Sequence, residues 1–282
     1  MSQFVLIPRL KIQNATLQTS GFVLGGAPLM AAAMFCHNLA RQLGTQETGF
    51  LLIHHDRQDL GSMAYGRFMP AQRRGATFIG KKDYSSKNKY ALSLQPTASC
   101  HLEVSLIIQF DRMRHLGRLI ELVGRSRFAG GQVIESDEIK QLQHVGDALK
   151  TVGSGFVVQD RKALLQTYQQ HYQVNRLQAL VQLLAQKPEQ RLPELSDVKL
   201  SWLAATALGY ALLEPSTDQR GGIRQANEQD TTRHAYAEPL IGLIQYQTLR
   251  DFDLNDAEQL QSLFWHYHWP QPDVFLLQQH VN

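Results

Sequence analysis

The chain has 282 residues, 43% of them hydrophobic, and a formal net charge of +3. This content suits one large or two modest globular domains and excludes a wholly disordered chain. Two cysteines exclude a disulfide framework and a Cys-x-x-Cys metal or redox pair. No stretch has the roughly 18 apolar residues of a membrane span, and the N-terminus lacks the apolar core of a signal peptide. We therefore expect a soluble, cytoplasmic protein.

The first part of the chain alternates strand and helix patterns. Residues 4–12 and 48–56 predict strands. A stretch of small and apolar residues between Pro28 and Gly44 predicts a helix over 28–43. The first strand is expected to place alternate residues on opposite faces, which are Phe4, Leu6, Pro8, Leu10 and Ile12 on one side and Val5, Ile7, Arg9 and Lys11 on the other.

A basic segment follows at 61–90. It holds seven Lys and Arg residues against one acid, so it carries +6 and the rest of the chain carries −3. Its composition predicts a long extended hairpin over about 57–95. A solvated basic loop would explain the charge alone, whereas interleaved aromatic residues favour contact with phosphates and unpaired bases. Those aromatic residues are Tyr65, Phe68, Phe78, Tyr84 and Tyr90.

Residues 101–110 show the clearest alternation, which predicts a strand with one face on the core. An amphipathic helix over 112–127, a strand from 131, a short helix near 137–150 and a strand at 155–159 follow. Two βαβ halves predict an α+β, ferredoxin-like (RNA-recognition-motif-like) sheet with helices on one face and the other face open. A doubly wound parallel sheet is the alternative, although its strands would be continuously apolar.

The remaining residues predict a helix or helix pair over 160–186, with Asp160 as N-cap, then a polar linker at 187–197. Strands are expected at 198–213 and 236–249, and an extended, aromatic end at 263–280. We divide the chain into a first domain at 1–159, a helical segment and linker at 160–197, and a strand-rich part at 198–282 that packs on the first domain.

The histidines do not form a recognisable metal or nucleophile motif. His54, His55 and Asp56 lack ligand spacing, and Cys36 and His37 are neighbours that diverge on a helix, so both are expected to be buried packing residues. We expect no metal and no cofactor. A metal-independent ribonuclease that uses a histidine as general acid or base stays open, since such sites have almost no sequence signature.

Two glycine-containing stretches are candidate phosphate sites. The sequence GGAP at 25–28 precedes a helix N-terminus, but no Gly-x-x-x-x-Gly-Lys-Ser/Thr or Gly-x-Gly-x-x-Gly motif occurs. The stretch RSRFAGGQVI at 125–134 joins two arginines to a glycine pair. It predicts either an ordinary turn or a backbone that approaches phosphate closely.

Several of these stretches together resemble the Csy-two family, the Cas-five-type subunits of type I-F CRISPR-Cas surveillance complexes. The resemblance runs from residue 4 to about 280. Its motifs are IPRLKIQNA (7–15), His37-Asn38-Leu39-Ala40-Arg41, GFLLIHH (49–55), HLEVSLII (101–108), RFAGGQVI (127–134), GFVVQDRKALLQ (155–166) and FWHYH (264–268). Departures from the family pattern, such as Ile244-Gln245-Tyr246 in place of Gly-Glu-Trp, suggest a divergent or minimal variant.

The resemblance implies a non-enzymatic subunit with a RAMP-type domain that grips the 5′ handle of the CRISPR RNA (crRNA). It also implies backbone (Cas-seven-type) subunits, a large subunit or its replacement, and target DNA as partners in antiviral defence. The basic arm would act as a thumb across the RNA. The candidate RNA-binding residues are Arg9, Gln13, Asn14, His37, His55, Arg67, Arg73, Arg74, Phe78, Lys81, Lys82, Tyr84, Lys87, Lys89, Arg125, Arg127, Gly130, Gly131, Arg224, Asn227 and Arg233.

An endoribonuclease that processes CRISPR repeat RNA is the alternative function, with His37, His55 or His115 as the catalytic group. For RFAGGQVI, we expect the glycines to make room for RNA, so that Gly131→Val lowers RNA affinity more than it lowers folding stability. A stand-alone RNA-binding regulator is the third alternative, and it would be a stable monomer.

The basic segment leads to a salt-dependence prediction. If about four of its charges contact single-stranded phosphates, the log-log slope of RNA affinity against salt concentration should be near −3, because each contact contributes about −0.7. Filter binding over a salt series measures this slope. A slope close to zero would contradict the assignment.

Overall fold

A computed structural model describes residues 3–21, 23–71, 98–185, 200–214 and 235–279. Most of the expected thumb, the linker at 187–197 and several candidate residues lie outside these ranges. The candidates outside them are Arg73, Arg74, Phe78, Lys81, Lys82, Tyr84, Lys87, Lys89, Arg224, Asn227 and Arg233. The chain is a mixed α+β protein built around a large antiparallel sheet.

Three long strands form the centre of the sheet: β1 (Gln3–Thr16), β4 (Glu47–Ala64) and β6 (Ser99–Phe110). β6 pairs antiparallel with both β1 and β4. The order continues to β8 (Gly131–Glu135) beyond β1, and to β10 (Phe156–Asp160) beyond β4. Every strand pair between described residues is antiparallel, so the doubly wound parallel alternative is wrong for this part of the chain.

The first strand contains two bulges that the sequence pattern did not reveal. Its register against β6 shifts between Ile7 and Leu10 and again between Ile12 and Ala15. Within these shifts Arg9 and Asn14 have positive φ angles of 48° and 58°. A bulge reverses the faces that follow it. Leu10 and Ile12 therefore join the core face of Val5 and Ile7, and the strict alternation predicted for residues 4–12 is wrong.

Helices cover both faces of the central strands. α1 (Leu29–Leu43) and α2 (Leu116–Gly124) pack on one face, and α3 (Val145–Val152) and α6 (Ala257–Gln261) pack on the other. Within β6, Leu106 belongs to the first core and Ile107 to the second. The predicted open face is therefore wrong where α3 and α6 lie. Beyond Ser105 the same face carries polar, partly exposed residues.

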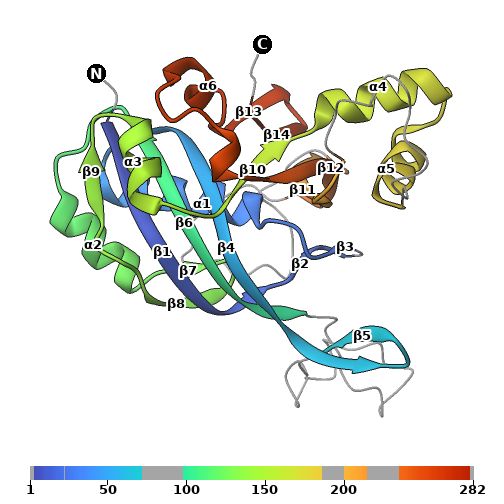
Figure 1. The fold of residues 1–282 in the computed structure, drawn as a ribbon, viewed down its shortest axis with the longest axis horizontal. Helices are drawn as coiled ribbons and strands as arrows, with labels where there is room; N and C mark the ends of the chain where they lie inside the picture. The colour runs from blue at the N-terminus through green and yellow to red at the C-terminus, as the bar shows by residue number, and fades with distance from the viewer. Residues whose placement is uncertain (1–2, 22, 72–97, 186–199, 215–234, 280–282) are drawn as a thin grey trace.

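The C-terminal strands extend the same sheet. β12 (Ala237–Thr248) pairs with β10, and β11 (Leu203–Leu212), β14 (Val274–Gln278) and β13 (His266–Gln271) follow in that order. Figure 1 shows α4 (Lys162–Tyr172) and α5 (Arg176–Ala185) as a helix pair beside these strands, as the sequence predicted. The predicted N-cap is wrong: Arg161 holds that position, and Asp160 accepts from the Lys162 N–H.

Some short elements were not expected. β9 (Lys140–Leu142) pairs with β1 where the sequence predicted helix, and α3 begins only at Val145. A 3-10 turn, η3 (Leu249–Asp251), and α6 precede the last strands. β2 (Gln18–Ser20) and β3 (Val23–Leu24) form a small separate sheet after β1. The hairpin of β4 with β5 (Arg67–Pro70), which turns at Tyr65 and Gly66, is the described start of the predicted arm (Figure 1).

The glycine pair of RFAGGQVI has two different roles. Ala129 and Gly130, with φ of 48° and 76°, form the two-residue loop between β7 (Arg127–Phe128) and β8, as a primed hairpin turn requires. A Cβ on Gly131 would lie 2.6 Å from the Ala15 nitrogen and 2.7 Å from the Gln13 oxygen. The space at Gly131 is thus filled by β1, so the expectation that this glycine makes room for RNA is wrong.

Gly131→Ala should lower the free energy of unfolding by roughly 1–3 kcal/mol, because the new methyl group would push β8 away from the β1 backbone. Urea unfolding of the full chain measures this change. Gly117→Ala in α2 is the matched control. A Cβ there has no neighbour within 4 Å, and alanine should be neutral or stabilising in a helix. Equal effects of the two variants would contradict the packing assignment.

Candidate nucleic-acid interface

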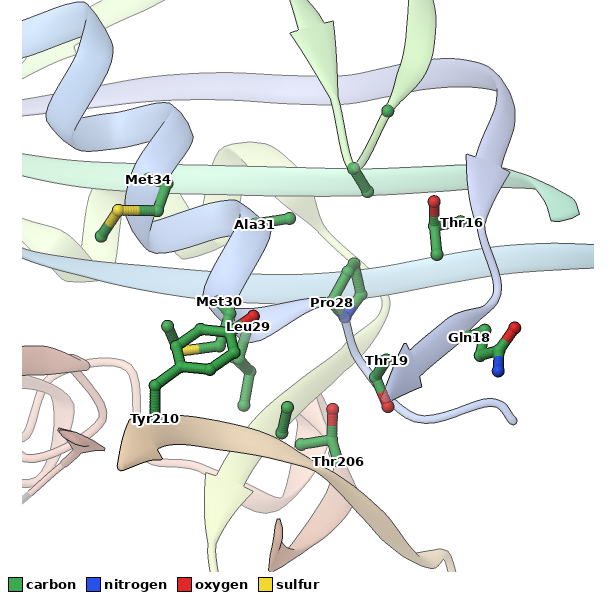
Figure 2. Close-up of a pocket in the computed structure, with 13 residues that line it drawn as sticks. Thr16, Gln18, Thr19, Pro28, Leu29, Met30, Ala31, Met34, Thr206 and Tyr210 are labelled. Atoms are coloured by element: carbon green, nitrogen blue, oxygen red, sulfur yellow. The ribbon is translucent and has the colours of Figure 1, made fainter. Parts of the chain in front are cut away.

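A cavity of about 320 Å³ lies where α1 begins, beside the glycine turn. Figure 2 shows Tyr210 rising from β11 toward Met30 at the start of α1, while Thr16, Gln18 and Thr19 lie on the side of β1 and β2. The lining joins parts of the chain that are far apart in sequence. Its residues are Thr16, Gln18, Thr19, Pro28, Leu29, Met30, Ala31, Met34, Ala129, Gly130, Thr206, Ala207 and Tyr210.

The loop before α1 is tightly seated on β11. The Thr206 hydroxyl donates to the Ala27 carbonyl at 2.7 Å, and a Cβ on Gly26 would lie 2.5 Å from the Ala205 carbonyl oxygen. Pro28 stands at the N-cap, so no side-chain cap bonds the first turn, which also lacks an acidic residue. The first N–H groups of a helix have no intrahelical partner, and the helix dipole favours negative charge there.

Two arginines flank the glycine turn. Arg125 follows α2, and Arg127 begins β7 and is registered against Gln132 of β8. Both residues are exposed, and neither forms an ion pair with any residue that the structure describes. The Thr16 N–H donates to the Ala129 carbonyl at 2.8 Å, which ties the turn to the end of β1. Two exposed cations without a described acidic partner therefore precede the turn, whose Ala129 and Gly130 line the cavity.

A second, shallow cavity of about 350 Å³ lies on the open part of the sheet face, between Gln13 and His101. Its cations are already neutralised. The Arg9 guanidinium donates to Glu103 at 2.9 Å and to Ser154 at 3.0 Å. The Lys11 ammonium pairs with Glu135 at 2.6 Å. This groove therefore offers little free positive charge to phosphate.

His54 and His55 are consecutive residues of β4 that have different partners. The His54 ring stands edge-on to Tyr246, with ring centroids 5.3 Å apart, and His55 Nε2 lies 2.7 Å from the Ser105 hydroxyl. Burial, helped by the nearby charge of Arg57, lowers the pKa of His54 to about 4. Burial and Arg9 lower the pKa of His55 to about 4 as well. Both rings are neutral at pH 7.

His37 belongs to a different cluster. The prediction that it is a buried packing residue is wrong, because its side chain is exposed. Its Nδ1 lies 3.0 Å from the Glu47 carboxylate and 2.9 Å from the Tyr267 hydroxyl. Burial and the hydrogen bond that Tyr267 donates to Glu47 raise the pKa of Tyr267, so this phenol stays protonated. Cys36 is fully buried, as expected, and burial raises the pKa of its thiol. The cluster fastens β13 to α1 and β4.

The structure brings together only some of the predicted residues. Gly130 lines the cavity, and Arg125 and Arg127 precede it in the chain. Arg9 and His55 belong to the sheet-face network, and the Asn14 N–H donates to His101 Nδ1 at 3.3 Å. Gln13 lines the groove. Arg67 lies in the exposed hairpin. Sequence reasoning missed Thr16, Thr19 and Tyr210, because no motif links β1, β2 and β11.

Within the described residues, no group of three or more His, Cys, Asp or Glu side chains could hold a metal ion. In the same part of the chain, no helix is long and apolar enough to cross a membrane.

The fold and its cavities define a mixed α+β protein with a large antiparallel sheet and an arginine-flanked hairpin turn. A family model described as CRISPR-associated protein (Cas_Csy2) matches residues 5–277. The chain belongs to this family, and it is therefore a Csy-type subunit of a CRISPR-Cas complex with other Cas proteins. None of the curated proteins compared with the chain matches it.

The half-buried residues His54 and His55 predict a loss of stability in mild acid. Because their pKa values fall from 6.5 to about 4 on folding, the unfolded chain binds more protons between these pH values, and stability falls as the pH falls. His54 alone should lower the free energy of unfolding by about 2 kcal/mol between pH 7.5 and pH 5.

Urea unfolding at both pH values checks this prediction. His54→Phe keeps a ring against Tyr246 and should reduce the pH effect by His54's share. His144→Gln, at an exposed histidine, is the matched control. A His54→Phe variant with the full pH dependence of the wild type would contradict the assignment.

Proposed function

We propose that this chain is the non-catalytic subunit of a type I-F surveillance complex that binds the 5′ handle of the crRNA. In this proposal it caps one end of the filament of backbone (Cas-seven-type) subunits in the cytoplasm. It also contacts the large subunit or its replacement and supports recognition of target DNA in antiviral defence. Membership of the Cas_Csy2 family supports a role in such a complex.

The observation that carries the proposal is the arginine-flanked turn. Arg125 and Arg127 are exposed and form no ion pair with described residues, and the turn between them and β8 borders a cavity. Arg9 and Lys11 of the sheet face are instead paired with Glu103 and Glu135. Phosphate binding needs cations that are not already neutralised. The turn is therefore a better place for the RNA backbone than the sheet face.

The strand order supports an RNA-recognition-motif-like (RAMP) domain. In chain order the elements β1, α1, β4, β6, α2 and β8 make two βαβ halves, and the sheet places them as β8-β1-β6-β4, all antiparallel. This arrangement is the split βαβ pattern of ferredoxin-like domains. We keep residues 1–159 as this domain, with the helical segment to 197 and the strand-rich part from 198 as additions to it.

Three histidines were the alternative catalytic groups, and their surroundings favour a binding role. His55 is neutral with its Nε2 already bonded to Ser105, and His37 is engaged by Glu47 and Tyr267. His115 stands at the N-cap of α2, on another element. General acid-base catalysis needs two groups that converge on one reacting atom. The described contacts give the His37 and His55 rings structural partners instead.

The double variant Arg125→Gln/Arg127→Gln should bind handle RNA more weakly and make the salt slope shallower by about 1.4, because each lost phosphate contact removes about 0.7. Filter binding over a salt series measures both quantities. Arg118→Gln is the control, since Arg118 is a surface arginine of α2 that pairs with Glu121. It should leave the slope unchanged, and an equal effect of the two variants would contradict the proposal.

A second measurement tests the complex itself. Co-expression of the chain with a repeat-spacer array and backbone subunits should yield crRNAs with one defined 5′ end among the co-purifying RNA. Random cellular RNA would contradict the proposal. Incubation of the purified chain with labelled repeat RNA in the absence of metal should give no site-specific cleavage. Cleavage that disappears on His37→Ala, His55→Ala or His115→Ala would establish the ribonuclease alternative.

A further inference from the structure

We propose that the cavity beside the glycine turn receives one unstacked base of the bound RNA. Tyr210 and Met34 would pack against the faces of the base, and the hydroxyls of Thr16 and Thr19 would bond to its edge. The inference rests on the proposed function, because it gives a specific role in RNA recognition to a cavity that the arginine-flanked turn borders.

The size and lining of the cavity suit a flat, heteroaromatic ligand. Its volume of about 320 Å³ lies at the lower end of the roughly 300–1,000 Å³ range of small-ligand sites. The lining is apolar at α1 and β11, where Met30, Met34 and Tyr210 lie. It is polar at β1 and β2, where Thr16, Gln18 and Thr19 lie. A base needs both surfaces, because its faces are apolar and its edge carries hydrogen-bonding groups.

Two large apolar side chains at this cavity are exposed to solvent. Met34 is 41% exposed on a helix whose other apolar residues are mostly buried, and Tyr210 is 39% exposed in a strand paired on both sides. β12 and β14 fix the backbone of Tyr210, so its ring is presented from a rigid element. Stacking on a ring held in this way loses little conformational freedom.

At the end of the cavity formed by β1 and β2, a buried polar atom without a partner indicates a ligand. Thr19 Oγ1 is inaccessible to solvent and has no hydrogen-bond partner within the described residues. An unsatisfied buried hydroxyl is destabilising, and native proteins contain few of them. The Thr16 hydroxyl lies 3.3 Å from the position of a Cβ on Gly130, so the glycine keeps the space beside it clear. The edge of a base would supply a partner for the Thr16 hydroxyl, and for Thr19 Oγ1 once a rotation of its side chain turns it toward the cavity.

An apolar side chain of a neighbouring protein subunit is the other occupant to consider. It would fill the Met34 and Tyr210 end but would leave Thr19 Oγ1 without a partner. It would also give no role to Arg125 and Arg127, which precede the turn that borders the cavity. An RNA strand accounts for all of these features, because its phosphates would lie at the arginines while one base enters the cavity.

The test uses the full chain assembled with its co-expressed backbone subunits, and handle RNAs that each lack one base. In the wild type, removal of the base that enters the cavity should weaken binding by about tenfold, the usual scale for one base stacked on an aromatic ring. In Tyr210→Ala, intact RNA should bind about tenfold more weakly, and removal of that same base should cause no further loss. Tyr172→Ala is the control, since Tyr172 is a comparably exposed tyrosine on α4.

Thr19→Val tests the hydrogen bond to the edge of the base separately from the packing against its faces. The substitution keeps the shape of the side chain, so the thermal stability of the protein should be unchanged or slightly higher. Discrimination among the four bases at that one RNA position should fall.

If the wild type binds no handle RNA, the proposed function fails together with this inference. If the arginine variants weaken binding but the base-removal profile of Tyr210→Ala equals that of the wild type, only the inference fails. Loss of a protein subunit from Tyr210→Ala with an unchanged RNA profile would show a protein-docking cavity and overturn it.

Discussion

The rest of the molecule depends on the pairing of β6 with β1 on one side and β4 on the other. Side chains of β6 point alternately into two cores, one under α1 and α2 and one under α3 and α6. Residues such as Val104 and Ile107 are completely buried, so neither face is free at this level of the sheet. Binding surfaces are consequently confined to the places where the covering helices end. The start of α1, beside the last residues of β1, is such a place.

Bulges in the central strands decide which side chains reach the uncovered surfaces. At Arg9 the register shift places the N–H against the Ser105 hydroxyl and the guanidinium against Glu103. The shift in β4 between His54 and Asp56 brings the His55 ring to the same serine. Ser105 thus joins two bulges in neighbouring strands. The residues that resemble a family motif here hold the strands together, and their polar atoms are largely used by one another.

Local sequence patterns were sufficient to predict most helices and strands but not the candidate site. Pro28 and Gly44 bracketed α1 correctly, and the alternation at 101–110 located β6, because capping and pleat are local properties. The burial of both faces of β6 was not foreseen, since Ser105 interrupts the apolar run in the way a half-exposed strand would. The cavity joins Thr16, Gly130 and Tyr210 from three separate stretches, and only the sheet order makes them neighbours.

Gly130 and Gly131 show that the residues that hold this part of the fold together differ from the residues that would bind a ligand. Gly131 is required because β1 passes directly above it, and Gly130 because the hairpin loop needs a positive φ and the Thr16 hydroxyl lies beside it. The hydrogen bond from Thr16 to Ala129 then makes the position of the turn a consequence of where β1 ends. Arg125 and Arg127 precede this fixed point, and Tyr210 faces it from a strand paired on both sides. A site of this kind is preorganised by the central sheet. Substitutions that loosen β8 from β1 should therefore weaken ligand binding even though they touch no ligand.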